Sequence, residues 1–214
     1  MSIGGNGSGT AGLQDDTLSS PFVRKPTLRG TLVTLRPYID SDLPDLASAI
    51  ADPEVQRLTG TLHSSAPTTD QNVPSDDRLR EWYATRSQQT DRLDLMIVDN
   101  TSNRCVGEAV LNEWDKENES CNFRIFIGPA GQNRGLGSEA TRLILDYAFT
   151  HLPLHRIELE VYAFNPRAQR VYEKAGFVVE GRRRDALLFD GERVDAIVMS
   201  ILKPEWELDT RPSD

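Results

Sequence analysis

Cysteine and long apolar runs are both scarce in this 214-residue chain. Its two cysteines, Cys105 and Cys121, are too few for a disulfide framework and lie at no metal-ligand spacing with the three histidines. The sequence lacks a run of roughly eighteen apolar residues that could cross a membrane, and its first residues lack the basic and apolar regions of a signal peptide. We therefore expect a soluble, cytoplasmic protein with no metal ion and no membrane partner.

Positive charge is also in short supply, since the formal net charge is -9. A nucleic-acid-binding domain needs a basic patch to displace counterions from phosphates. The only basic cluster here is residues 182–184, which stand close to the acidic Glu180 and Asp185. We therefore expect no nucleic-acid partner. An acidic chain favours cationic or neutral ligands, which permits an amine substrate.

Glycine and serine dominate only the beginning of the chain, where apolar side chains are too few to offset the entropy of ordering. We expect residues 1–22 to form a flexible tail, residues 23–205 to form one domain, and residues 206–214 to form a C-terminal tail. A domain of this length can bury a single sizeable core.

Apolar periodicity predicts the elements of that domain. Alternation at the strand period marks residues 31–36, 93–98, 105–111, 122–127, 155–161 and 177–179, and the flanks of the turn Asp190-Gly191. Helical periodicity marks residues 41–50, 78–88, 138 onward and 166–174. A long polar loop over residues 58–77 precedes the second helix. The order predicts an α/β (mixed α+β) fold, with an antiparallel meander first and strand–helix crossovers later.

The most informative segment is a glycine-rich loop, Gly131-Gln-Asn-Arg-Gly-Leu-Gly137, which joins a strand to a helix. At the start of a helix, unsatisfied backbone N–H groups and the positive end of the helix dipole bind anions, and glycine lets phosphate oxygens come close. The spacing is not that of the G-x-x-x-x-G-K-[ST] motif, because no Lys follows Gly137, and it is not that of the G-x-G-x-x-G motif either. Taken alone, the segment fits a phosphate site and a plain glycine-rich connection equally well.

Two motifs in order carry a resemblance: Gln132-x-x-Gly135-x-Gly137, and residues 165–177 with the sequence NPRAQRVYEKAGF. Over roughly residues 27–202 the chain resembles the GNAT acetyltransferase superfamily, within it the branch of bacterial enzymes that acetylate ribosomal-protein N-termini. Glu180-Gly181-x-x-Arg184 and the hairpin containing Asp195 resemble the same branch. The resemblance implies the GNAT fold, a central twisted mixed sheet of about seven strands with helices on both faces. It also implies acetyl-CoA as a co-substrate and no metal.

The resemblance further implies where acetyl-CoA binds. The main chain of one strand would bind the pantetheine arm, through Ile125, Phe126 and Ile127. Backbone amides of the loop would hold the pyrophosphate, at Gln132, Asn133, Arg134, Gly135, Leu136, Gly137 and Ser138. Asn165 would contact the amide chain of the cofactor, although it fits a plain helix N-cap equally well.

Catalysis would need no enzyme nucleophile, because an amine can attack the thioester carbonyl directly. By resemblance, Tyr172 lies beside the coenzyme A sulfur and protonates the departing thiolate; its other interpretation is a core aromatic residue. The Ile127 amide would stabilise the carbonyl oxygen. Glu108 is the first candidate for the general base. Glu113, Asp115 and Glu158 are further candidates, and each also fits a plain surface carboxylate.

The leading hypothesis is therefore an N-acetyltransferase that acts on a protein N-terminal α-amine or on a small-molecule amine. Detoxification of an amine-bearing antibiotic is the nearest rival activity. A coenzyme A-binding sensor without turnover is the alternative from another class, although the intact Tyr172 argues against it. The loop over residues 58–77 and the helix after it would form the acceptor wall. Strands near the ends of the chain could supply an edge for a homodimer.

Overall fold

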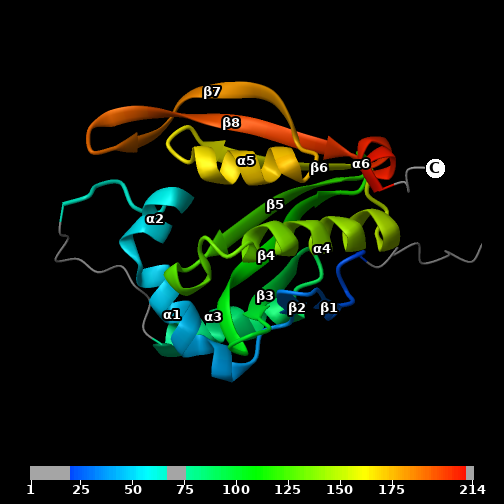
Figure 1. Ribbon diagram of the computed structural model, residues 1–214, viewed down its shortest axis with the longest axis horizontal. Helices are drawn as coiled ribbons and strands as arrows, with labels where there is room; N and C mark the ends of the chain where they lie inside the picture. The colour runs from blue at the N-terminus through cyan, green and yellow to red at the C-terminus, as the bar shows by residue number, and fades with distance from the viewer. Residues whose placement is uncertain (1–19, 67–75, 211–214) are drawn as a thin grey trace, which may run out of the picture.

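The computed structural model describes residues 20–66 and 76–210, and every statement about structure concerns these residues. The expectations for residues 1–19, 67–75 and 211–214 lie outside them. The described chain forms one twisted sheet with helices on both faces (Figure 1). None of the described helices combines the length and apolar character that crossing a membrane demands.

Eight strands form the sheet. In chain order they are β1 (Leu28–Arg29), β2 (Val33–Arg36), β3 (Leu93–Asp99), β4 (Arg104–Asp115), β5 (Ser120–Ile127), β6 (Arg156–Tyr162), β7 (Val178–Phe189) and β8 (Glu192–Leu202). The helices are α1 (Leu43–Ala51), α2 (Pro53–Thr59), α3 (Asp76–Gln88), α4 (Leu136–His151), α5 (Pro166–Lys174) and α6 (Lys203–Thr210), with short turns η1 (Asp40–Asp42) and η2 (Pro129–Gly131).

The strands lie in the order β1-β2-β3-β4-β5-β6-β8-β7. Every neighbouring pair is antiparallel except β5 and β6, which are parallel. The predicted mixed α/β fold with a meander followed by crossovers is confirmed. The sheet has eight strands rather than about seven, because the two-residue β1 is too short to show an alternating pattern.

One face of the sheet carries the main core, under α4 and α5. The amphipathic helix α4 buries Ala140, Ile144 and Ala148 against strand side chains such as Leu95 and Phe123. Burying a side chain of the size of Ile144 contributes about 1.5–3 kcal/mol. The strong helical period of α4 in the sequence therefore reflects a real core-facing stripe.

The opposite face is covered by α1 and α3 in one region. Met96 of β3 points to this face, because it alternates with Leu95, and it packs with Leu46 of α1 and with Tyr83 of α3. The two clusters separate the molecule into an α4–α5 side and an α1–α3 side. This division decides from which side each predicted site residue is reached.

The structure differs from the predicted elements and tail limits at three places, Asp52, Trp206 and Phe22. An additional helix, α2, follows the helix expected over residues 41–50, and Asp52 caps it by accepting a bond from Val55 N at Oδ1 (2.9 Å). Trp206 lies in α6, packs against Phe149 with the two rings tilted (5.6 Å between centroids) and donates to Asp146 (2.8 Å). Phe22 is fully buried in the core. Residues 22 and 206 therefore pack with the domain, and the other predicted limits stay predictions.

Candidate active site

Strands β5 and β6 are parallel but pair only at their beginnings. The pairing ends at Asn122 opposite Glu158. From there β5 runs on to Ile127 and β6 to Tyr162, and the described chain shows no further pairing between them as they diverge (Figure 1). Because a strand directs its N–H and C=O groups alternately to its two sides, β5 exposes backbone groups to this opening. We call it the wedge, bounded by residues 123–127 and 159–162.

The predicted phosphate loop follows directly from the wedge. The chain leaves β5 through η2 and enters α4, with left-handed φ values of 59° at Asn133 and 79° at Gly135. The first intrahelical bond runs from Glu139 N to Gly135 O (3.1 Å). The N–H groups of residues 136–138 therefore have no acceptor within the helix and are available to an anion at the positive end of its dipole, a place called the anion position below. The helix begins at Leu136, two residues before the predicted start.

Asn165 stands at the start of α5. Its Oδ1 accepts a hydrogen bond from Ala168 N (3.1 Å), which is the N-cap geometry. The interpretation of Asn165 as a cap is confirmed, and its contact with a cofactor stays a prediction. Gly176 follows α5 with φ 95°, a left-handed conformation that glycine adopts without strain.

Tyr172 of α5 lies at the narrow end of the wedge. Its ring is edge-on to Phe123, the first β5 residue beyond the last pair with β6, at 6.3 Å between centroids. It also contacts Phe177 at 5.9 Å. Burial raises the pKa of Tyr172 to about 12, so the hydroxyl keeps its proton at neutral pH. The residue is thus both a core aromatic and a protonated group beside the wedge.

Glu108 of β4 points to the other face of the sheet from Tyr172. It stands opposite Met96 and Phe126 and is therefore on the α1–α3 side. Burial, together with the Asp94 carboxylate, raises the pKa of Glu108 to about 7, although a hydrogen bond from Tyr83 acts in the opposite direction. Its side chain is half-buried. A carboxyl group with this pKa can take up and release a proton at neutral pH.

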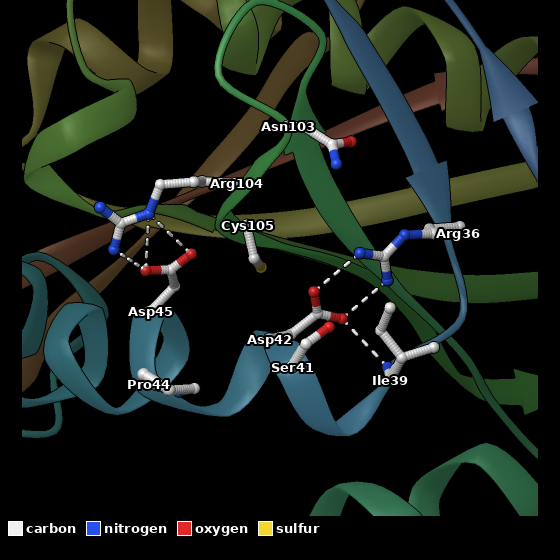
Figure 2. A pocket seen from close by; sticks show the side chains of 9 residues that line it. All are labelled: Arg36, Ile39, Ser41, Asp42, Pro44, Asp45, Asn103, Arg104 and Cys105. Carbon is white, nitrogen blue, oxygen red and sulfur yellow. Dashed lines mark hydrogen bonds and ion pairs between the residues drawn. The ribbon is translucent and has the colours of Figure 1, made fainter.

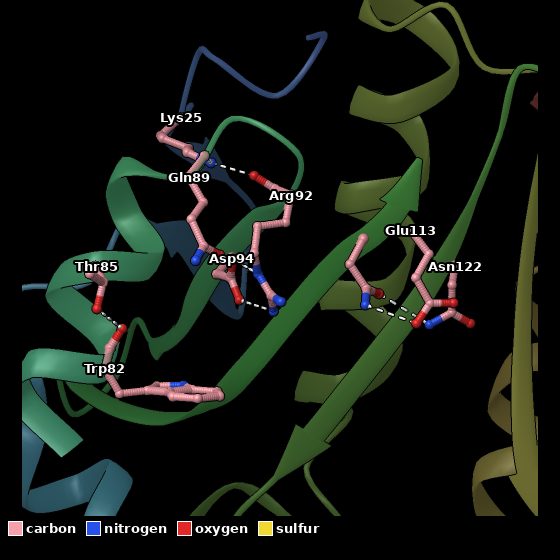
Figure 3. Close-up of polar contacts among 9 residues, drawn as sticks. Lys25, Trp82, Thr85, Gln89, Arg92, Asp94, Glu113 and Asn122 are labelled. Atoms are coloured by element: carbon pink, nitrogen blue, oxygen red, sulfur yellow. Dashed lines mark hydrogen bonds and ion pairs between the residues drawn. The ribbon is translucent and has the colours of Figure 1, made fainter. Parts of the chain in front are cut away.

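Asp94 is held in place by its own ion pair. Its Oδ1 lies 2.6 Å from Arg92 Nη2, and Figure 3 shows the two side chains facing one another beside α3. The carboxylate is almost fully buried. Asp94 therefore places a fixed negative charge near Glu108, which favours the protonated form of Glu108.

The other candidate bases interact with their own neighbours. Glu113 lies at a strand irregularity with φ 56° and accepts a bond from Asn112 (3.4 Å), beside Asn122 in Figure 3. Asp115 accepts a bond from Asn118 Nδ2 (2.7 Å), and this contact lowers its pKa. Glu158 pairs with Arg156. None of these features marks them as bases, and Glu108 stays the first candidate.

The chain matches a known protein family over most of its domain. The family model described as the acetyltransferase (GNAT) domain matches residues 33–178. The chain belongs to the GNAT acetyltransferase family.

Curated relatives of this GNAT domain differ in what their names say they acetylate. A spermidine N(1)-acetyltransferase of Vibrio cholerae is 34% identical over 51% of this chain and 64% of its own length. That of Escherichia coli K12 is 31% identical over 60% of this chain and 75% of its own length. A putative ribosomal N-acetyltransferase of Bacillus subtilis, YdaF, is 32% identical over 47% of this chain and 55% of its own length. This chain thus covers less than two thirds of the Vibrio and Bacillus relatives.

Solved structures show the same fold. The spermidine N-acetyltransferase of Vibrio cholerae in complex with CoA and spermine superposes with a TM-score of 0.71 at 26% identity, over 83% of this chain and 99% of that chain. Because relatives of both the spermidine and the ribosomal kind occur, the comparisons support the GNAT family as a whole. They do not single out the ribosomal-protein branch that the sequence resembles.

Three consecutive side chains of the GNAT loop bind to three different elements. Gln132 Nε2 donates to Ile127 O of β5 (3.2 Å), Asn133 Oδ1 accepts from Arg167 Nη1 of α5 (3.0 Å), and Arg134 Nη1 donates to Asp99 Oδ2 of β3 (2.9 Å). These bonds tie the loop to β5, α5 and β3. Sequence reasoning missed Asp99 and Arg167, because the first reads as a turn residue and the second as an ordinary helix residue.

Two surface grooves lie beside α1, apart from Tyr172 and Glu108. The smaller, of 420 Å³, contains the ion pairs Arg36–Asp42 and Arg104–Asp45 (Figure 2). The larger, of 530 Å³, reaches from α1 to the loop and has Arg134 on its wall. Among the described residues, no group of three or more His, Cys, Asp or Glu side chains is placed to hold a metal ion.

Proposed function

We propose that this protein transfers the acetyl group of acetyl-CoA to a primary amine. One observation carries the proposal: the open edge of β5 leads straight into the unsatisfied N–H groups at the start of α4. A pantetheine arm needs strand-like hydrogen-bond partners, and a pyrophosphate needs backbone donors at a helix start. The wedge and the loop present these groups in the order in which coenzyme A presents its own.

The chain would hold acetyl-CoA mainly with its backbone. The backbone groups that the stretch Ile125, Phe126 and Ile127 turns toward the wedge would bind the pantetheine arm, and the amides of residues 132–138 would bind the pyrophosphate. Asn165 uses its Oδ1 as the cap of α5, which leaves its Nδ2 group to donate to the amide chain of the cofactor.

The amine would attack the thioester carbonyl, so that a C–N bond forms and the C–S bond breaks. The Ile127 amide would stabilise the carbonyl oxygen, and Tyr172 would give its proton to the departing thiolate. Glu108 would accept the proton of the incoming ammonium, directly or through water. Tyr172 and Glu108 face opposite sides of the sheet, so the thioester would come from the α4–α5 side and the amine from the α1–α3 side.

A small cationic amine is the first candidate acceptor. Glu108 and Glu158 lie on the face from which the amine would come, the chain is acidic overall, and two relatives are spermidine acetyltransferases. A protein N-terminal α-amine is the second candidate, favoured by the ribosomal-type relative. The homodimer and the cytoplasmic location stay predictions of the sequence.

Calorimetric titration with acetyl-CoA, run beside a thiol-release assay, tests the proposal. The acceptor panel contains spermidine, an aminoglycoside and short peptides with free α-amines. Binding with thiol release on spermidine supports the first candidate, and release only on peptides supports the second. Tight binding without release across the panel would favour the sensor alternative. No binding of acetyl-CoA would remove the proposal.

A further inference from the structure

Arg134 stands in the middle of the anion-binding loop, yet its guanidinium is bound to groups of the protein itself. Its Nη1 donates to Asp99 Oδ2 at 2.9 Å and to the carbonyl of Ala130 at 3.3 Å. About 42% of the Arg134 side chain is exposed, whereas only 2% of the Asp99 side chain is exposed. The loop is therefore tied to a carboxylate that lies inside the protein.

The Asp99 carboxylate, at the end of β3, accepts hydrogen bonds from three residues. Besides Arg134 it accepts hydrogen bonds from Thr101 N (3.0 Å) and Ser102 Oγ (2.7 Å). The bond from Arg134 is the main cause that lowers the pKa of Asp99 to about 2. Asp99 thus stays charged at neutral pH, and a charged carboxylate without its arginine would be costly inside the protein.

The topology explains why a residue of β3 can reach this loop. β3 and β5 are each antiparallel to β4, so they run in the same direction and end at the same edge of the sheet. Asp99 is the last residue of β3, and the loop begins shortly after Ile127, the last residue of β5. The ion pair therefore crosses the beginning of β4, which lies between the two strand ends, and joins segments 35 residues apart in sequence.

The anchor acts on a backbone that turns twice through the left-handed region. Asn133 has a φ of 59° and Gly135 has a φ of 79°, and Asn and Gly adopt this region more readily than other residues do. These two residues set the direction of the N–H groups at the start of α4. A loop that sampled other conformations would have to be ordered by the ligand, at a cost to affinity.

We infer that Asp99 and Arg134 are positioning residues, which fix the anion-binding loop in its ligand-ready conformation before acetyl-CoA binds. This inference rests on the proposed function. Neither side chain contacts the reacting atoms. The pair acts through the backbone of the loop, so its loss should weaken cofactor binding without changing the chemical step.

The test compares wild type with Asp99→Asn, Arg134→Gln and the double variant by calorimetric titration of acetyl-CoA. We expect each single variant to raise the Kd about tenfold, and the double variant to be no weaker than the singles, because all three lose the same contact. Arg134→Lys, which keeps the charge, should recover part of the affinity. The KM for acetyl-CoA should rise, while kcat at saturation and the KM for the amine stay unchanged.

Two further measurements separate positioning from general damage. Arg104→Gln is the control, because Arg104 also lines the 530 Å³ groove but forms its ion pair with Asp45, outside the loop. This variant should leave the Kd for acetyl-CoA unchanged. Amide hydrogen exchange of the free protein should show faster exchange at residues 132–138 in Asp99→Asn and Arg134→Gln, but not in Arg104→Gln.

Some outcomes would overturn the inference. If Arg134 binds a phosphate directly, Arg134→Gln would weaken binding while Asp99→Asn would leave the Kd unchanged or lower it. Additive losses in the double variant, or an equal fall in kcat, would also contradict a role through the loop. Failure of wild type to bind acetyl-CoA would instead remove the proposed function, so the two failures are distinguishable.

Discussion

Glu108 and Tyr172 lie on opposite faces of one sheet, Glu108 opposite Phe126 on the α1–α3 side and Tyr172 against Phe123 on the α4–α5 side. Phe123 and Phe126 are three residues apart on β5, and an odd spacing on a strand places side chains on opposite faces. A base and an acid in this arrangement suit two substrates that meet from two sides. Each of the two residues therefore makes a separate prediction.

The pKa of Glu108 predicts how activity depends on pH. Because a base acts only when it is deprotonated, kcat/KM should rise with pH and level off above about 7, where the carboxylate predominates. Glu108→Gln should lower the plateau by about 10²-fold and remove the rise near pH 7. A steady-state pH profile of both proteins measures this. An unchanged profile in the variant would exclude Glu108 as the base.

The same pKa shift has the opposite consequence for stability. The pKa of Glu108 rises from 4.5 to about 7 on folding, so the folded state binds the proton more tightly than the unfolded state. The contribution of this group to stability is fully present below pH 4.5 and is lost as pH rises through about 7. In urea unfolding at several pH values, the free energy of unfolding of wild type should fall relative to that of Glu108→Gln as pH rises over this window. A constant difference would contradict the shift.

Tyr172→Phe tests the proposed acid. The ring keeps its contacts with Phe123 and Phe177, so melting temperature and acetyl-CoA affinity should stay nearly unchanged. Turnover should fall by about 10²-fold, because the departing thiolate loses its proton donor. Thiol release under saturating conditions provides the measurement. Equal turnover in both proteins would leave Tyr172 as a core residue alone.

Gly135→Val tests the phosphate position. Gly135 has φ 79°, and a β-branched residue in this region costs roughly 1–2 kcal/mol. The nearest side-chain atom, Leu32 Cδ1, lies at an ordinary 3.5 Å from the position of an added Cβ, so the effect would come from the backbone. The Kd for acetyl-CoA should rise at least about tenfold. Unchanged calorimetric binding would contradict the assignment of the loop.

Glu139, in the first turn of α4, makes a prediction about stability. Its carboxylate accepts three backbone hydrogen bonds from the turn before β2, from Thr31 N (3.0 Å), Leu32 N (2.7 Å) and Val33 N (2.7 Å). Glu139→Ala should lower the free energy of unfolding by about 1.5–3 kcal/mol. Glu139→Gln keeps one carbonyl acceptor and should lose less. Equal stability of Glu139→Ala and wild type in urea would show that water replaces these bonds.

The sequence predicted elements whose signal is local. The period of α4, the alternation of β3 and β5, and the cap formed by Asn165 each depend on residues close together in the chain. The glycine-rich loop and the helix after it could be predicted because they are adjacent in the chain, whereas the binding of an anion there stays a prediction.

The elements that were missed lack such a signal. Helix α2 is only seven residues long, and β7 was recognised only at its two ends, at residues 177–179 and just before Asp190, because its central part is polar and exposed at the sheet edge. Asp99 and Arg134 come together because β3 and β5 run in the same direction on the two sides of β4 and finish at the same end of the sheet. No pattern within either segment indicates this.

Because β5 and β6 pair through only three residue pairs, the sheet consists of two blocks, β1–β5 and β6–β8. A ligand arm lying along the open edge of β5 would stand where further residue pairs are missing, as a short extra strand that lends the two blocks cohesion. The co-substrate would then be part of the architecture while it is bound, and each turnover would return the protein to a looser sheet.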